Sequence, residues 1–181
     1  MRWDDRLAGH FDGLFDDLEQ QAEGLALGAR DADVAEQRRW EYAQVDLASR
    51  LYASVGARLL VSVRGVGAVD GRLRRAGDGW CLLEAGSQEW IVRLAAVGSM
   101  RGLADRAVAP QARSVTAGLG LGSALRGVAE TRADTVLHGT DGSLLRGVLG
   151  RVGADFVEAR IGEGGVVEVV PFDALAAVRT T

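Results

Sequence analysis

The residues of this sequence whose type and spacing best suit ligand binding are arginines. Four of them gather between positions 64 and 75, and a fifth follows at the matching place in a second, similar stretch. The candidates are Arg64, Arg72, Arg74, Arg75 and Arg151. Guanidinium groups neutralise phosphates, so such a face could hold a nucleic-acid backbone with strong salt dependence. The alternative is a solvated outer face of a barrel that the acidic N-terminal arm partly neutralises.

Patterns typical of catalysis or of metal binding are not found. His10 and His138 are the only histidines, and neither has a carboxylate at metal-site spacing. Ser123 and Ser143 follow glycines, but neither lies in a G-x-S-x-G motif. The glycine-rich stretch at 118–123 lacks the lysine of a P-loop. We therefore expect a non-enzymatic binding protein that uses no cofactor and no metal.

Composition indicates the compartment and the class of protein. The chain has 181 residues, 48% of them hydrophobic, yet no apolar run is long enough to span a membrane. Cys81 is the single cysteine, and the acidic N-terminus does not have the pattern of a signal peptide. We expect a cytoplasmic protein that is not bound to membranes. All 21 basic residues are arginine, which is typical of a GC-rich, for example actinobacterial, genome.

The first 36 residues are strongly acidic, with ten carboxylates and three arginines, whereas the remainder is mildly basic. Their apolar residues recur at steps of three and four, which predicts an amphipathic helix. Five of them are candidate interface residues, namely Trp3, Leu7, Phe11, Leu14 and Leu18. This stripe would pack either on the body of its own chain or on a second copy. A second helix is expected from about Asp33 to Val55.

The rest of the sequence contains an internal repeat of short, glycine-punctuated segments with an apolar period of two. Gly71 aligns with Gly147, Gly77 with Gly153, and Trp80 with Phe156. A repeat of this kind implies duplication of one structural unit. We expect four regions, namely a helical N-terminal arm (1–56), a first barrel (57–103), a linker (104–114), and a helix with a second barrel (115–181).

The second repeat resembles the Sm-like family and, within it, the bacterial Hfq branch. The resemblance rests on the Asp141-Gly142 turn, on Gly147 inside the next strand, and on the closing segment 169–178. It implies an α+β fold of two tandem small antiparallel Sm-like (SH3-like) β-barrels, each preceded by a helix, behind the N-terminal acidic amphipathic helix. Other small SH3-like barrels would satisfy much of the same pattern.

Members of that family bind RNA on the faces of a ring of subunits, but this chain departs from the family's contact loops. It has Gly153, Asp155 and Val157 in one loop, and Phe172-Asp173 where the bacterial branch has a Lys-His pair. Two functions stay open. One is a regulator that binds RNA or DNA through arginines. The other is an oligomeric protein-interaction or scaffold module, whose partners are further copies, in a dimer or ring, or other proteins.

Overall fold

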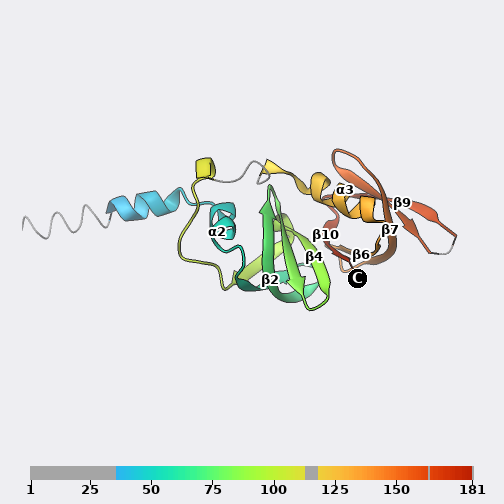
Figure 1. Ribbon diagram of the computed structural model, residues 1–181, viewed down its shortest axis with the longest axis horizontal. Helices are drawn as coiled ribbons and strands as arrows, with labels where there is room; N and C mark the ends of the chain where they lie inside the picture. The colour runs from blue at the N-terminus through green and yellow to red at the C-terminus, as the bar shows by residue number, and fades with distance from the viewer. Residues whose placement is uncertain (1–35, 113–117, 163, 181) are drawn as a thin grey trace, which may run out of the picture. The chain divides into compact units, whose positions relative to one another are not determined.

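The computed structural model describes residues 36–112, 118–162 and 164–180. The chain divides into two compact units, residues 1–45 and residues 46–181. The described part of the first unit contains a helix over residues 36–43. The second unit contains the helices and strands labelled in Figure 1.

The first half of the second unit begins with helix α2 (Leu47–Ala53), whose N-cap Asp46 accepts a hydrogen bond from the Ser49 amide at 2.6 Å. Five strands follow, with one 3-10 turn, η1 (Leu94–Ala96), before the last. These strands are β1 (Arg58–Val63), β2 (Gly67–Gly77), β3 (Trp80–Ala85), β4 (Gln88–Arg93) and β5 (Val97–Arg101). The expected single helix from Asp33 to Val55 is thus interrupted, because the Asp46 cap starts a new helix.

The second half follows the short 3-10 turn η2 (Pro110–Ala112) and begins with helix α3 (Leu121–Thr131). Leu121, Leu125 and Val128 recur on one face of α3, and this face packs on the strands. The strands of this half are β6 (Asp134–Gly139), β7 (Leu144–Val152), β8 (Phe156–Ile161), β9 (Val166–Pro171) and β10 (Leu175–Thr180).

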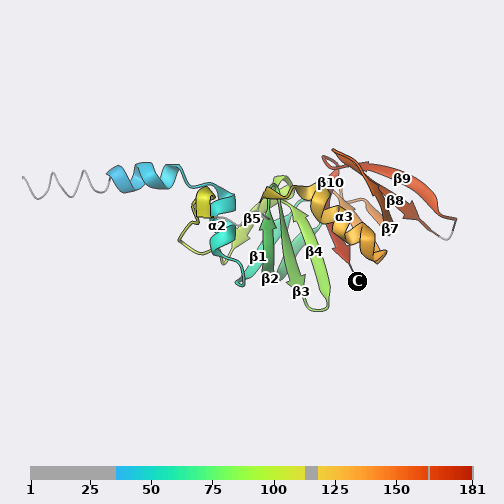
Figure 2. The ribbon, with the colours of Figure 1, turned by 45° about the horizontal axis from the view of Figure 1, so that its top comes forward.

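All ten strands belong to one open antiparallel sheet in the order β5-β1-β2-β3-β4-β10-β6-β7-β8-β9. The predicted fold class, two tandem small Sm-like barrels, is therefore wrong, because β4 and β10 pair and make the two halves continuous. Figure 2 shows β1 to β4 side by side in this arrangement. Each half alone would leave unpaired backbone N–H and C=O groups along β4 and β10, and pairing satisfies them.

The two halves repeat the same local order, with the last strand beside the first, so their residues correspond. Gly71 lies opposite Leu59, and Gly147 lies opposite Thr135, at the same point of the first hairpin in each half. A β-bulge follows two residues later in both, after Leu73 and after Leu149. Residues that align in the sequence repeat, such as Gly71 and Gly147, therefore occupy equivalent positions in the two halves of the sheet.

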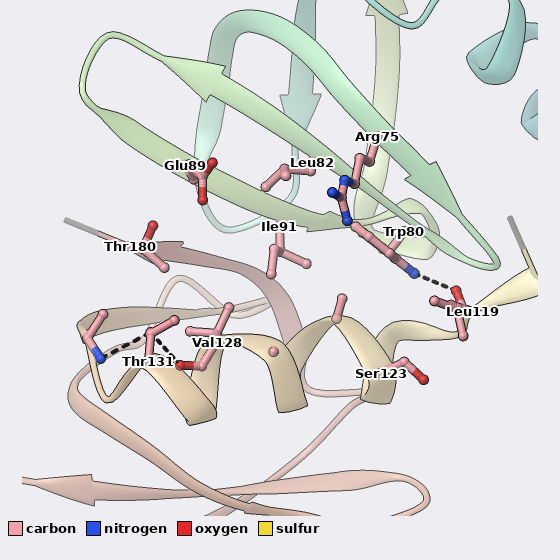
Figure 3. Close-up of a pocket in the computed structure, with 13 residues that line it drawn as sticks. Arg75, Trp80, Leu82, Glu89, Ile91, Leu119, Ser123, Val128, Thr131 and Thr180 are labelled. Carbon is pink, nitrogen blue, oxygen red and sulfur yellow. Dashed lines mark hydrogen bonds between the residues drawn. The ribbon is translucent and has the colours of Figure 1, made fainter. Parts of the chain in front are cut away.

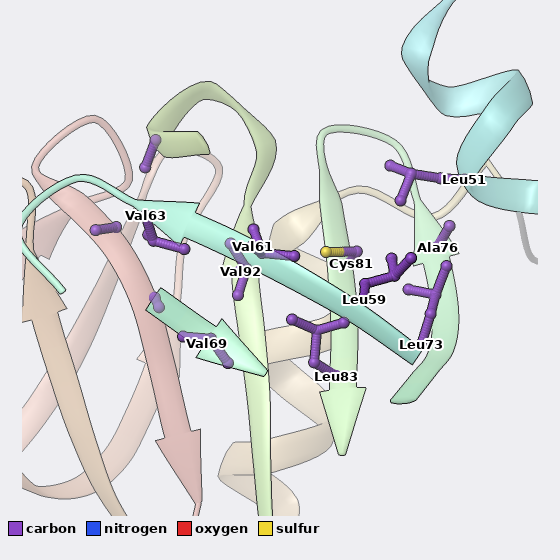
Figure 4. Packing of buried hydrophobic residues seen from close by; sticks show 13 residues of the cluster. Leu51, Leu59, Val61, Val63, Val69, Leu73, Ala76, Cys81, Leu83 and Val92 are labelled. Carbon is purple, nitrogen blue, oxygen red and sulfur yellow. The ribbon is translucent and has the colours of Figure 1, made fainter. Parts of the chain in front are cut away.

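Two clusters of buried side chains stabilise this unit by removing apolar surface from water. The first lies mostly in the first half, where it includes Leu51, Leu73 and Cys81 (Figure 4), and it also takes in Ala176 and Ala177 of β10. Cys81 is fully buried, as its strand pattern indicates, and burial raises the pKa of its thiol to about 12. The second cluster joins the halves, because Trp80 and Ile91 of the first half pack with residues of α3 and of the second half.

Candidate interaction surfaces

Two of the predicted nucleic-acid-binding arginines form ion pairs with carboxylates on the neighbouring strand. Arg74 Nε lies 2.9 Å from Glu84 Oε2. Arg151 donates to both carboxylate oxygens of Glu158, at 3.0 and 2.9 Å, and this hydrogen-bonded pair raises the Arg151 pKa. Arg74 and Arg151 are therefore already matched by negative charge within the fold.

The other predicted arginines are distributed over different parts of the first half. Arg72 donates to the Gly56 carbonyl oxygen at 2.7 Å, and Arg64 donates to the carbonyl oxygen of Ala95. Arg74 and Arg75 line one hollow, whereas Arg72 lines another. The candidate interface residues Trp3, Leu7, Phe11, Leu14 and Leu18 lie outside the described residues.

A cleft of about 470 Å³ lies between the strands of the first half and helix α3 (Figure 3). Trp80, Leu82 and Ile91 form its strand wall, and Trp80 Nε1 donates to the Leu119 carbonyl oxygen at 2.8 Å. Arg75 and Glu89 bring opposite charges to the same cleft. The cleft is thus mainly apolar, and it offers no surplus charge to a nucleic acid.

A second basic surface, which was not predicted from the sequence, lies in the second half. Arg146, Arg160 and Arg179 line a hollow of about 440 Å³, together with Asp134. Arg146 and Arg179 stand opposite Val136 on its two neighbouring strands. The three arginines are far apart in the sequence, so only the strand pairing brings them together. The equivalent hollow of the first half contains acids, Asp70 and Glu84, at the places of Arg146 and Arg160.

The join between the halves has the features of an interface. Arg179 of β10 lies over the Trp90 ring of β4, with its guanidinium carbon 5.5 Å from the ring centroid, and the His138 ring centroid lies 5.0 Å from that of Trp90. Burial and the nearby Arg179 charge lower the pKa of His138. Arg93 forms an ion pair with Asp173 across the same join. Backbone pairing, stacking and charge therefore all hold β4 against β10.

The sheet ends in two outer strands, β5 and β9, and β9 is strongly apolar. Val166, Val167 and Val169 are 64%, 52% and 60% exposed. The residue of β4 that corresponds to Val169 is Ile91, which is 5% exposed. Folded proteins usually protect an edge strand with charge, proline or a covering element, and an exposed apolar patch often marks an interaction site. The β9 edge is therefore the surface most suited to bind another strand.

Comparisons with known proteins do not assign a function to this chain. No family model matches it, and no curated protein matches it. Within the described residues, no three side chains of the metal-ligating types cluster together. None of the described helices is both long and apolar enough to cross a membrane.

Proposed function

We propose that this protein is an oligomeric scaffold module that joins copies of itself through the outer strands of its sheet. The observation that carries this proposal is the exposed valine edge of β9. An edge strand offers a row of unpaired N–H and C=O groups, and apolar side chains on it favour pairing with a further strand. Of residues 166–170, only Glu168 is charged, so charge does little to prevent such pairing.

The internal join supports the same proposal. There, β4 and β10 meet edge to edge, and the apolar residues Ile91 and Val92 of β4 are buried. The chain thus already contains one contact of the kind that β9 and β5 would make between copies. The single buried cysteine agrees with a reducing, cytoplasmic location for the assembly. All 21 basic residues are arginine, which agrees with a GC-rich, actinobacterial source.

The mass of the full chain in solution tests this proposal. Size-exclusion chromatography with light scattering should give the mass of two or more copies of the 19.1 kDa chain. Val169→Lys should return the chain to the mass of one copy, since a lysine on an edge opposes pairing. Leu144→Lys is the matched control, because Leu144 is 53% exposed but does not lie on an outer strand. A wild-type chain that stays monomeric at all concentrations would overturn the proposal.

A second candidate function is the binding of RNA or DNA, which the hollow lined by Arg146, Arg160 and Arg179 favours. The resemblance to the Sm-like family, which stays a prediction, points the same way. Anisotropy of a labelled single-stranded RNA at low salt distinguishes the two arginine sets. The hollow is the binding site if the double variant Arg146→Glu with Arg160→Glu loses RNA binding while the double variant Arg72→Glu with Arg75→Glu keeps it. No binding by the wild type would reject the second candidate.

A further inference from the structure

The internal join specifies how two copies would align. In the first half, Trp90 of β4 lies opposite Leu83 of β3. In the second half, Glu168 of β9 lies opposite Ala159 of β8. Since Leu83 and Ala159 hold the same place after the β-bulge of their halves, Glu168 corresponds to Trp90.

The other outer strand, β5, corresponds to β10 by the same reasoning. Arg101 of β5 lies opposite Leu60 of β1, and Arg179 of β10 lies opposite Val136 of β6. The pairing of each strand is irregular near the start of that strand. In the β1–β5 pair the register shifts at Val63 of β1, and in the β10–β6 pair it shifts after Leu175 of β10. Arg101 therefore corresponds to Arg179. In the internal join, Arg179 lies directly opposite Trp90.

Resting on the self-assembly proposed above, we propose that β9 of one copy pairs antiparallel with β5 of the next copy in the register of the internal join. Glu168 then lies opposite Arg101 of the next copy, and Val169 lies opposite Met100 of the next copy. The register is transferred from four internal pairs, Ala177 with Val92, Val178 with Ile91, Arg179 with Trp90, and Thr180 with Glu89.

The residues that this register brings together are chemically complementary. Where the internal join places an arginine over a tryptophan, the contact between copies places an arginine opposite a carboxylate. Within the described residues, neither Glu168 nor Arg101 forms an ion pair, and both are exposed. Opposite charges directly across a strand pair stabilise that pairing. Val169 and Met100 would bury apolar surface beside them.

The helices fit the same arrangement. Helix α3 precedes the strands of the second half and covers Ile91 of the first half at the internal join. Its counterpart α2 precedes the strands of the first half and leaves Leu47 and nearby Val55 exposed. In the assembly, this apolar surface would approach Val169 of the preceding copy. Because the two edges differ, the contact is head-to-tail and produces either a closed ring or a filament.

Charge reversal tests the register. Glu168→Arg and Arg101→Glu, each alone, should place like charges opposite one another and weaken association about tenfold or more, measured by sedimentation velocity at low salt. Mixing the two single variants should restore association, because each contact between unlike variants joins an arginine to a glutamate. Glu130→Arg, which reverses an exposed charge on α3, is the control and should leave association unchanged.

The outcomes separate the register from the assembly itself. Suppose the wild type is oligomeric and Val169→Lys dissolves the oligomer, but neither reversal weakens it. The edge contact then stands, and the proposed register is wrong. Loss in both single variants without recovery on mixing also overturns the register. A monomeric wild type overturns the self-assembly on which this inference rests.

Discussion

Strands β4 and β9 occupy the same position in the two halves of the sheet, yet their surroundings differ completely. β4 lies between β3 and β10 and beside α3, so Ile91 is buried, whereas β9 has β8 on one side only, so Val169 is exposed. Both strands carry β-branched apolar residues at these places. The residue type therefore suits a covered position in both halves, but only Ile91 is covered by other strands and a helix of its own chain.

The largest expected effect comes from placing a charge at the two equivalent positions. Ile91→Asp should lower the free energy of unfolding by about 4 kcal/mol, because it buries an unpaired carboxylate in the join between the halves. Val169→Asp should change the stability of a dilute monomer by less than about 0.5 kcal/mol, since the site is exposed. Urea unfolding followed by circular dichroism measures both.

The same pair of variants tests the roles of the two strands. Val169→Asp should abolish association while keeping stability. If Val169→Asp costs as much stability as Ile91→Asp in dilute protein, β9 is covered within the single copy, and the comparison fails.

A slightly smaller effect is expected from the equivalent buried leucines Leu73 and Leu149. Leu→Ala at either place should cost about 3 kcal/mol through lost burial and the cavity left behind. Because one sheet and one shared cluster join the halves, either substitution should shift a single unfolding transition. Two separate transitions, of which each variant moves only one, would show that the halves fold independently.

Much of this structure follows from sequence pattern. The short strands, the helix over Leu121–Thr131 and the correspondence of Gly71 with Gly147 reflect local periodicity and glycine placement. The join of β4 with β10 could not be predicted, because it depends on residues such as Trp90 and Arg179 that are distant in the sequence. The partners of Arg74 and Arg151 are closer in the sequence, but each lies on the neighbouring strand, and a β-bulge shifts the register of both strand pairs. The sequence pattern does not show that shift.

The equivalent glycines Gly71 and Gly147 should differ in how much stability their replacement costs. A Cβ at Gly147 would overlap the carbonyl oxygen of Arg160, and one at Gly71 would lie 2.7 Å from that of Glu84. Both neighbours are backbone atoms that cannot move freely. Gly147→Ala and Gly71→Ala should each cost about 1–3 kcal/mol, the former more, in urea unfolding. Negligible costs at both positions would mean that the two hairpins are less closely packed than this geometry implies, and equal costs would mean that the closer approach at Gly147 has no effect.

The smallest expected effect is a pH dependence at the internal join. Burial and the Arg179 charge lower the pKa of His138 below 6.5, its ordinary value. The folded state therefore favours the neutral ring, and the stability contribution of this group is complete above about pH 6.5 and decreases as the pH falls below that value. His138→Gln should reduce the difference between urea midpoints at about pH 7.5 and about pH 5.5. An unchanged difference would exclude His138 as its source.

The central claim is that β9 and β5 join copies as β4 and β10 join the halves, and cross-linking tests it most directly. Chains carrying Val169→Cys are mixed with chains carrying Met100→Cys. In the proposed register the two introduced cysteines lie opposite each other, within reach of a disulfide bond. Native Cys81 is buried, with a pKa of about 12, and should not react. We predict a disulfide-linked dimer in this mixture, and far less when Val166→Cys replaces Val169→Cys. Equal yields in both mixtures, or no cross-link in a protein that is oligomeric by mass, would contradict the account.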